Sequence, residues 1–309
     1  MRWTTYVSRT DQAEHAALLV DGELFGVDRP LIELLRSDLS LAAWGERAMT
    51  APWERCSVEE AALVAPIPVP PSIRDFMAFE NHVVTSYAAL GTEVSPVWYD
   101  QPVFYFSNPA AVLGPQDVVT LAPGSERFDY ELEIAAVIGR AGRDLHPDTA
   151  EDHIAGYLIL CDWSARDLQS TEMRVGLGPA KGKDTATSLG PYLVTPDELE
   201  PFRAGRGFDL GMRATVNGRE YSSGNWSDLY WSFGEMLAYA SRGTELRPGD
   251  LIGSGTVGTG CILELGLTHG ADRYPWLQPG DDVLIEVDQL GAVRTSVQDT
   301  PAADPIPLR

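Results

Sequence analysis

The sequence predicts a mixed α+β fold that is rich in β-strands. Strand-like runs dominate beyond about residue 69, among them "DYELEIAAVIG", "GYLILCD" and "DDVLIEVDQLGAVRTSV". These runs do not alternate regularly with helical segments, which disfavours a doubly wound parallel sheet. With 309 residues, 44% of them hydrophobic, the chain can form a large core and carry an additional small domain.

Residues 1–68 predict a small N-terminal α/β domain. The segment "WTTYVSR" is typical of a strand, and "AALLVDGELFGVD" predicts strands around an Asp-Gly turn. "PLIELLRSD" and "SVEEAAL" predict short helices, with Pro30 and Ser57 as their start signals. The proline-rich "APIPVPPS" predicts a stiff joint, after which residues 69–309 form a second, larger domain.

The elements expected after this joint are mostly strands. Further strands are predicted for "PVFYFS", "GPYLVT", "DLIGSGTV" and "CILELGL", and Asn217-Gly218 predicts a hairpin turn. After "GYLILCD", Ser164 and Asp167 resemble a capping box that opens a short helix. The segment "SFGEMLAYASRG" predicts a second helix, which ends at a glycine.

Composition argues against several classes of partner. The formal net charge of −22 disfavours nucleic acid and anionic membranes as partners, because both require a basic surface. Three widely separated cysteines indicate a reducing compartment, and the start of the chain lacks an apolar signal region. No apolar run approaches the roughly 18 residues of a membrane span. We therefore expect a cytoplasmic protein that acts on a small molecule.

The segment "GSGTVG", Gly253 to Gly258, matches the G-x-G-x-x-G pattern of dinucleotide sites. That pattern requires a helix directly after it. The following "TGCILELGL" alternates like a strand, which disfavours a nicotinamide or flavin site. The alternative is that these glycines let the backbone turn closely around a small ligand.

A pair of glutamates in "FDYELEIAAVIG" predicts a metal site. Glu131 and Glu133 are two residues apart in a strand and point to one face, which Ala135 and Val137 continue. Two like charges on a buried face resist ionisation, and a hard cation such as Mg²⁺, Mn²⁺ or Ca²⁺ removes this conflict. A solvated strand edge is the alternative for an isolated Glu-x-Glu pair.

The segment "CDWSARDLQ" supports the metal hypothesis. Asp162 ends an apolar strand, and Arg166 and Gln169 follow at helical spacing on one face. This layout suits a metal together with an anionic substrate, whereas the alternative is a capped surface helix with an ordinary ion pair. Elsewhere, Glu264 interrupts an apolar run, and we hypothesise that it orients the ring of His82.

Together these segments resemble the fumarylacetoacetate hydrolase family. "RDFMAFENH", "DYELEIAAVIG", "CDWSARDLQ", "KGKDTATSLGP" and "GSGTVGTGCILELG" occur in the family's order across residues 75–266. The resemblance implies a catalytic fold of rolled, barrel-like mixed β-sheets, a homodimer, a divalent metal and a role in aromatic catabolism. It implies metal ligands at Asp75, Glu131, Glu133 and Asp162, and water activation by His82 with Glu264. It also implies that Arg166, Gln169 and Lys183 bind and polarise the substrate. Tyr105 and Thr256 are implied as secondary substrate contacts.

The activity that this resemblance implies is hydrolysis of a C–C bond in a β-diketone or acylpyruvate-type 2-oxo acid. Water activated by the His-Glu pair attacks one carbonyl, and the metal stabilises an enolate. The alternatives are an isomerase, decarboxylase or lyase acting on an oxaloacetate- or muconate-type acid, and a ligand-binding protein without activity. Fumarylacetoacetases carry a tyrosine where this chain has Met77, and "HVVTSYAALGTEVSPVWYD" lacks their substrate-binding arginine. The distal group of the substrate is therefore left open.

Lys181 and Lys183 are the only lysines, since the other 21 basic residues are arginines. An ammonium group is compact, and burial can lower its pKa, whereas a guanidinium is planar and always charged. Lys183 therefore suits a crowded metal site, as a charge and as a possible proton donor. We expect Lys181 to lie in a solvent-facing loop.

Overall fold

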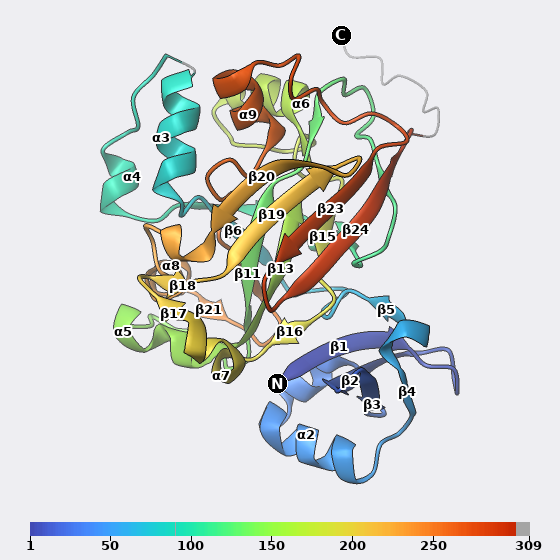
Figure 1. The fold of residues 1–309 in the computed structure, drawn as a ribbon. Coiled ribbons are helices and arrows are strands. Elements are labelled where there is room, and N and C mark those ends of the chain that lie inside the picture. Colours follow the sequence, from blue (N-terminus) through green and yellow to red (C-terminus); the bar gives the residue numbers. More distant parts are fainter. Residues whose placement is uncertain (90, 301–309) are drawn as a thin grey trace.

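The N-terminal unit consists of antiparallel strands with two helices. The structure is a computed structural model that describes residues 1–89 and 91–300 (Figure 1). The elements of this unit are β1 (Arg2–Val7), β2 (Glu14–Val20), β3 (Glu23–Gly26), α1 (Leu31–Arg36), α2 (Leu41–Thr50), β4 (Arg55–Ser57) and β5 (Ala62–Val64). Asp21 and Gly22 form the predicted turn between β2 and β3, with φ angles of 49° and 81°.

Two features of this unit differ from the prediction. Helix α2 was not expected; the side chain of Ser40 accepts a hydrogen bond from the backbone N–H of Ala43 at its start. The second predicted helix, in "SVEEAAL", is only a single 3₁₀ turn over Val58–Glu60, capped by Ser57. The chain then extends because β5 pairs with β1, which satisfies its backbone groups in a sheet.

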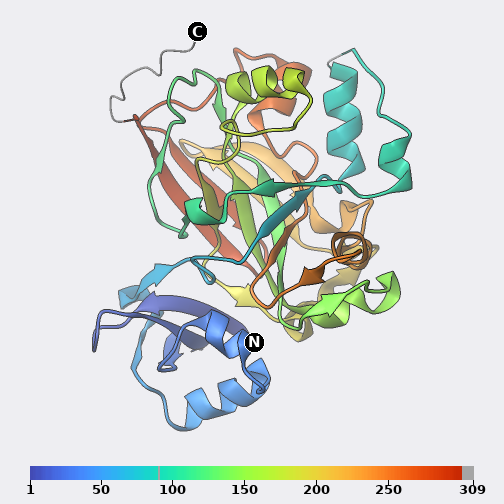
Figure 2. The same cartoon turned by 180° about the vertical axis from the view of Figure 1, so that it is seen from behind.

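A long mixed sheet joins this unit to the rest of the chain. Its other strands are β6 (Ile73–Phe76), β7 (Phe104–Ser107), β8 (Val112–Leu113), β11 (Leu132–Ile138), β13 (Ile154–Asp162), β15 (Thr187–Leu189), β16 (Leu193–Val194) and β22 (Leu251–Gly253). The order is β4-β3-β2-β1-β16-β13-β11-β22-β6-β7, with β5, β8 and β15 at the side, which makes 13 strands. Because Arg2 of β1 pairs with Val194 of β16, the sheet is continuous across the predicted boundary at residue 68 (Figure 1, Figure 2).

A second, five-stranded sheet faces the first. It contains β9 (Val119–Thr120), β19 (Gly211–Val216), β20 (Arg219–Asn225), β23 (Asp282–Val287) and β24 (Gly291–Gln298), in the order β20-β19-β23-β24-β9. Asn217 and Gly218 form the predicted hairpin turn between β19 and β20. Shorter strands form two-residue pairs: β10 (Phe128–Asp129) with β14 (Ser164–Ala165), β12 (Gly142–Arg143) with β21 (Glu245–Leu246), and β17 (Arg203–Ala204) with β18 (Gly207–Phe208).

Helices cover the edges and ends of the sheets. They are α3 (Glu80–Ala89), α4 (Val97–Asp100), α5 (Pro147–Ala150), α6 (Arg166–Glu172), α7 (Pro196–Leu199), α8 (Phe233–Ala240) and α9 (Ile262–His269). The prediction of α8 is confirmed, and Ser232 and Glu235 form a capping box at its start. The prediction of a strand for "CILELGL" is wrong, because this segment forms α9. Buried Ile262 and Leu265 are three residues apart and lie on one face of this helix.

Strand β11 is buried on both faces and separates two hydrophobic cores. Ile134 and Ala136 belong to the larger core, which includes residues of β19 and β23 from the second sheet. Ala135 and Val137 belong to the other core, which includes Trp3 and other residues of the N-terminal unit. The predicted burial of this strand is therefore confirmed for both faces, and its end is a low-dielectric environment for any charge placed there.

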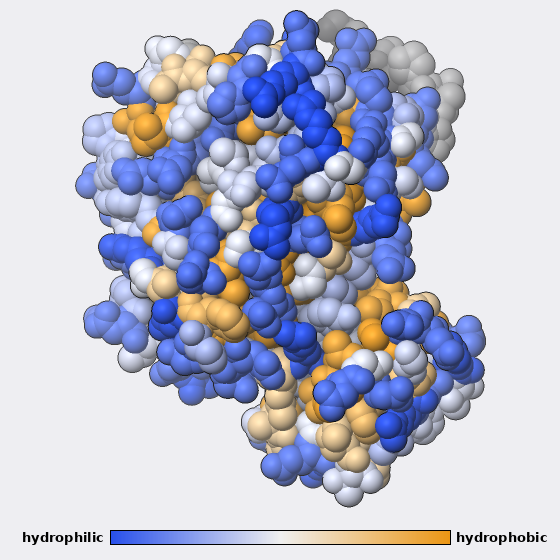
Figure 3. Space-filling model, viewed as in Figure 1, coloured by the Kyte–Doolittle hydropathy of each residue, from blue (hydrophilic) through white to orange (hydrophobic). Residues whose placement is uncertain are grey.

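The surface is largely polar, as the strongly acidic composition requires. Figure 3 shows mostly hydrophilic residues on one face, with apolar residues gathered near the junction with the N-terminal unit. Among the described residues, no helix is long and apolar enough to cross a membrane.

Candidate active site

The register of four strands places the first group of site residues. Asp75 of β6 lies opposite Gly253 of β22 and opposite Tyr105 of β7. Ala135 of β11 also lies opposite Gly253, so Glu133, two residues earlier, lies near Asp75. A Cβ atom at Gly253 would be 2.4 Å from Oδ1 of Asp75. Glycine at this position therefore leaves the space that the Asp75 carboxylate occupies.

The glycine-rich segment after β22 binds carboxylates of the chain itself. The backbone N–H of Gly255 donates to Oδ1 of Asp75 at 3.2 Å and to Oε2 of Glu133 at 3.1 Å. Gly255 has a φ of +77°, and a Cβ there would be 2.4 Å from the carbonyl oxygen of Phe76. Thr256 donates from Oγ1 to Oε1 of Glu133 at 3.4 Å. The glycines thus allow the backbone to approach carboxylates of the chain itself, and the expected close turn around a small ligand stays a prediction.

Lys183 lies at the centre of the carboxylates. Its Nζ donates to Oε2 of Glu131 and, at 2.5 Å, to Oδ2 of Asp162, which also accepts a hydrogen bond from the Tyr105 hydroxyl. Burial alone would lower the pKa of Lys183, but the Asp162 and Glu131 carboxylates raise it above the ordinary value. Lys183 is therefore a permanent positive charge here, not the proton donor of lowered pKa that the sequence suggested. Lys181 is exposed and pairs with Asp184 at 2.7 Å.

Arg166 lies behind Glu131 and holds it in place. Its Nη2 is 2.8 Å from Oε1 of Glu131, and its Nη1 donates to Oε1 of Gln169 at 3.1 Å, as the helical spacing predicted. The predicted capping box before this helix is wrong. The N-cap residue is Ala165, whose side chain cannot cap, and the Asp167 carboxylate instead accepts bonds from the Ser125 hydroxyl and the backbone N–H of Glu126.

Asp129 is a fully buried carboxylate that the sequence analysis missed. Its Oδ2 accepts from Nε of Arg166 at 2.8 Å and from the backbone N–H of Leu263 at 3.0 Å, and its Oδ1 accepts from the N–H of Ile262 at 2.7 Å. In a dinucleotide site, the N–H groups in the first turn of the helix bind the pyrophosphate. In α9, Asp129 already accepts hydrogen bonds from two of these N–H groups, which argues against such a site. The period-two spacing of Asp129 with Glu131 could have identified it.

Replacing Asp129 by alanine is expected to destabilise the fold. The substitution leaves the buried guanidinium of Arg166 without its Nε partner and two helix N–H groups unbonded. Breaking a buried pair in this way costs about 3–5 kcal/mol of the free energy of unfolding, which urea denaturation measures. Asp148→Ala is the control, because that side chain is 86% exposed. An Asp129→Ala protein as stable as this control would contradict the assigned role.

His82 and Glu264 form the predicted pair. Nδ1 of His82, on α3, is 2.6 Å from Oε2 of Glu264, on α9, and Oε1 of Glu264 accepts from the backbone N–H of Thr259 at 2.9 Å. Because an ionised carboxylate only accepts, we assign the ring proton to Nδ1. Nε2 then carries the lone pair, so this nitrogen can accept a proton from water.

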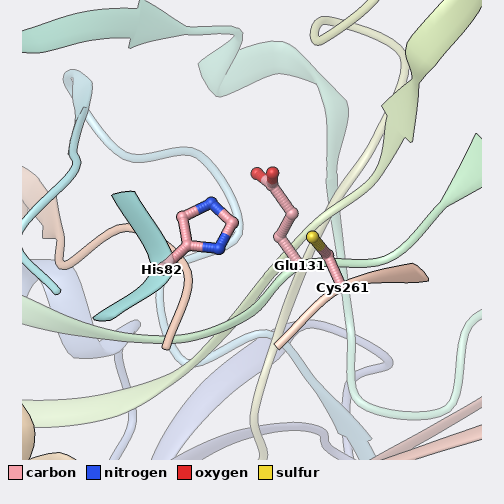
Figure 4. Close-up of side chains that lie close together, drawn as sticks. All are labelled: His82, Glu131 and Cys261. Carbon is pink, nitrogen blue, oxygen red and sulfur yellow. The ribbon is translucent and has the colours of Figure 1, made fainter. Parts of the chain in front are cut away.

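One cluster of potential metal ligands includes a cysteine. Among the residues that the structure describes, His82, Glu131 and Cys261 place three such atoms within 4.8 Å of one another (Figure 4). Burial raises the pKa of the Cys261 thiol well above its ordinary value, and its sulfur accepts from the backbone N–H of Glu264 at 3.5 Å. This thiol therefore serves as the N-cap of α9, and a hard divalent ion would prefer the neighbouring carboxylates.

These residues lie along a cavity of about 290 Å³. The predicted site residues that line it are Asp75, His82, Tyr105, Glu131, Glu133, Gln169, Lys183 and Thr256. The other predicted site residues, Arg166, Asp162 and Glu264, are buried behind this lining, where each contacts a residue that reaches the cavity. The remaining lining residues are apolar.

The comparison with protein families agrees with this arrangement. The family profile described as "Fumarylacetoacetate (FAA) hydrolase C-terminal" matches residues 72–298, most of the chain. The chain belongs to the fumarylacetoacetate hydrolase family. A solved fumarylacetoacetate hydrolase from Exiguobacterium antarcticum superposes with a TM-score of 0.73 and 25% identity, over 97% of this chain and all of the other. The predicted β-rich fold of this family is therefore confirmed.

Relatives in the fumarylacetoacetate hydrolase family carry different activities. Fumarylacetoacetase of Arabidopsis thaliana is 31% identical over 266 residues, which cover 68% of this chain and 63% of the relative. The match thus spans less than two thirds of that protein. Oxaloacetate tautomerase YisK of Bacillus subtilis is 30% identical over 243 residues, which cover 78% of this chain and 74% of the relative. Membership alone therefore leaves hydrolase and tautomerase chemistry open.

The charge balance of the site fits the divalent metal that this family typically binds. Burial raises the pKa of Asp75 to about 6 and that of Asp162 to about 7, and it raises the pKa of Glu133 well above the ordinary value. Oδ1 of Asp162 is buried without a hydrogen-bond partner. Their raised pKa values mean that these carboxylates resist ionising together beside Lys183 alone, and a bound hard cation would relieve this conflict.

Glu131 is the exception among these carboxylates. Burial disfavours its ionised form too, but the charges of Arg166 and Lys183 hold its pKa below the ordinary value. Glu131 is therefore a fixed anion beside the cavity.

Proposed function

We propose that the protein is a metal-dependent hydrolase that cleaves the C–C bond of a β-diketone or acylpyruvate-type 2-oxo acid. For an acylpyruvate the balanced reaction is R–CO–CH₂–CO–COO⁻ + H₂O → R–COO⁻ + CH₃–CO–COO⁻ + H⁺. The observation that carries this proposal is the 2.6 Å contact between His82 and Glu264, which leaves Nε2 of His82 available beside the carboxylate-lined cavity.

The metal would be held by Asp75, Glu131, Glu133 and Asp162. When bound, it supplies a Lewis acid that polarises the carbonyl oxygens of the 2-oxo acid. Mg²⁺ and Mn²⁺ are the preferred candidates, with Ca²⁺ as a third, because all the proposed ligands are carboxylate oxygens.

His82 is the proposed general base. Its Nε2 takes a proton from water, and the oxygen of that water attacks the acyl carbonyl carbon. Glu264 stabilises the resulting imidazolium through its bond to Nδ1. When the C–C bond breaks, its electron pair moves to the CH₂ carbon of the departing 2-oxo acid. Protonation of that carbon completes the products.

Donors around the cavity stabilise the charge that develops on the attacked oxygen. We assign this role to Lys183 and Gln169, which line the cavity. Arg166 acts through its bonds to Gln169 and Glu131, and Tyr105 and Thr256 are further contacts for the substrate.

A small panel of acylpyruvates tests this proposal. Loss of ultraviolet absorbance from the diketone enol is followed with Mg²⁺, with Mn²⁺ and with a chelator. We expect metal-dependent loss that gives a carboxylic acid and a 2-oxo acid in equal amounts, and return of activity when metal is restored after chelation. Turnover that is unaffected by complete metal removal would contradict the proposed cofactor.

A second candidate function is tautomerisation of a 2-oxo acid such as oxaloacetate. It is supported by the Bacillus subtilis relative, whose sequence this chain covers to 74%. A tautomerase moves a proton between carbon and oxygen and needs no attack by water. Oxaloacetate and a muconate-type acid therefore belong in the same panel. Their conversion without cleavage of any acylpyruvate would favour this second function or the isomerases of the family.

Homodimer formation and a cytoplasmic location remain predictions. Sedimentation of the purified protein measures the first of them directly.

A further inference from the structure

The cavity is lined by both polar and apolar residues. The polar lining includes the carboxylates, Lys183 and His82. The apolar lining consists of Phe76, Met77, Val103, Phe104, Met173 and Pro179. A 2-oxo acid head group bound by the polar residues therefore leaves the rest of the substrate to contact apolar residues.

The lining that the structure describes offers no free cation to a second negative charge. Among the described residues that line the cavity, Lys183 is the single cation, and its ammonium already pairs with Glu131 and Asp162. Arg74 precedes Asp75 in β6 and lies on the same face of the sheet as Phe76 and Phe104, with its guanidinium 5.9 Å from the centre of the Phe104 ring. It does not line the cavity, and its buried guanidinium already pairs with the Asp250 carboxylate at 3.5 Å. A carboxylate at the distal end of a substrate would have to be desolvated without a counter-ion.

The cavity is partly open to solvent. Phe76 and Phe104, whose rings pack 5.1 Å apart on the face that Arg74 shares, contribute to the lining beside the sheet. Met173 and Val103, at 52% and 39% exposure, lie nearer to solvent. The volume of about 290 Å³ lies just below the usual range for ligand pockets, about 300–1,000 Å³. The site thus fits a short acyl group.

On the basis of the proposed function, we infer that the acyl substituent of the substrate is uncharged and apolar, a short alkyl or aryl group, and that Met77 contributes to this selectivity. The structure thereby distinguishes this protein from an enzyme for a substrate with carboxylates at both ends. Flexible methionine side chains suit such a pocket because they adapt to apolar groups of different shape.

The test compares two acylpyruvates of equal chain length, one ending in a methyl group and one in a carboxylate. For the wild-type protein we expect kcat/KM to be about 10- to 100-fold higher for the methyl compound, the penalty of an unpaired buried polar group. Met77→Arg adds a cation to the lining of the cavity and is expected to reverse or abolish this preference. Met77→Leu is the matched control and is expected to retain it.

Binding to the His82→Ala protein provides a readout that does not depend on turnover. Calorimetry in the presence of Mg²⁺ should give a lower Kd for the methyl compound than for the carboxylate compound. If neither compound is cleaved but this order holds, the hydrolase proposal fails and the inferred selectivity stands. If both are cleaved with equal efficiency, or the carboxylate compound is preferred, the inferred selectivity is wrong and the hydrolase proposal stands.

One cation near the mouth requires a separate variant. Arg174 is exposed and follows Met173, so its side chain is a candidate to reach a distal carboxylate. Arg174→Ala is expected to leave the preference for the methyl compound unchanged. The inference would be overturned if the wild-type protein preferred the carboxylate compound and Arg174→Ala selectively lost activity on it. Recognition of the distal carboxylate would then be assigned to Arg174.

Discussion

If the protein is the proposed hydrolase, His82→Ala is expected to lower kcat on an acylpyruvate by about 10²–10⁴-fold, the usual contribution of a general base. The affinity for Mn²⁺ stays close to that of the wild type, because the proposed metal ligands are carboxylates. Steady-state kinetics measure the first quantity and calorimetry the second. If His82 instead binds the metal, as its proximity to Glu131 and Cys261 would allow, the Mn²⁺ affinity falls together with kcat.

Glu264→Gln tests the other member of the pair. The amide cannot stabilise the imidazolium, so we expect kcat to fall. The double variant with His82→Ala is expected to lose little more kcat than His82→Ala alone, because the two residues act as a unit. His269→Ala is the control, since this exposed histidine lies on the same helix as Glu264. Near wild-type turnover of both single variants would end the hypothesis of a water-activating pair.

The second large effect is expected for Lys183→Arg, which lowers kcat by about 10²–10³-fold, the cost of losing one preorganised donor. The guanidinium is planar and bulky, and it cannot replace the ammonium between Glu131 and Asp162. Lys181→Arg is the matched control, because Lys181 is two residues away, exposed, and paired only with Asp184 at the surface. Activity and thermal unfolding of both variants are measured together.

Equal losses in the two lysine variants would contradict the distinction between them. A Lys183→Arg protein that unfolds at the wild-type temperature but turns over slowly would place the defect in the site. This outcome also explains why lysine stands at position 183 in a chain whose other basic residues, apart from Lys181, are arginines.

The sequence predicted well the parts of the site that depend on local periodicity. The period-two alternation placed Glu131, just before β11, and Glu133, in β11, on one face, and both line the cavity. The helical spacing placed Arg166 beside Gln169. The contact between His82 and Glu264, 182 residues apart, was also predicted, because a glutamate inside an apolar run needs a partner. The family resemblance supplied the histidine as that partner.

Features that depend on long-range contacts were missed. The segment that forms α9 alternates like a strand, and it becomes helical where Asp129, 133 residues earlier, accepts hydrogen bonds from its first turn. Asp129 itself was overlooked because its partners, Arg166 and the start of α9, are brought to it by tertiary structure. The continuity of the central sheet into the N-terminal unit likewise rests on the pairing of Arg2 with Val194. Local sequence patterns do not specify these long-range partners, although the period-two spacing of Asp129 with Glu131 does point to Asp129 itself.

The most direct test of the central claim is product analysis in ¹⁸O-labelled water. The protein is incubated with Mg²⁺ and a short-chain acylpyruvate, and early products are compared with an enzyme-free sample to correct for carbonyl exchange. If His82 activates water for C–C hydrolysis, each turnover gives one carboxylic acid with one labelled oxygen and one molecule of 2-oxo acid. Consumption or isomerisation of 2-oxo acids without a labelled carboxylic acid would contradict the hydrolase proposal and favour a tautomerase at the same site.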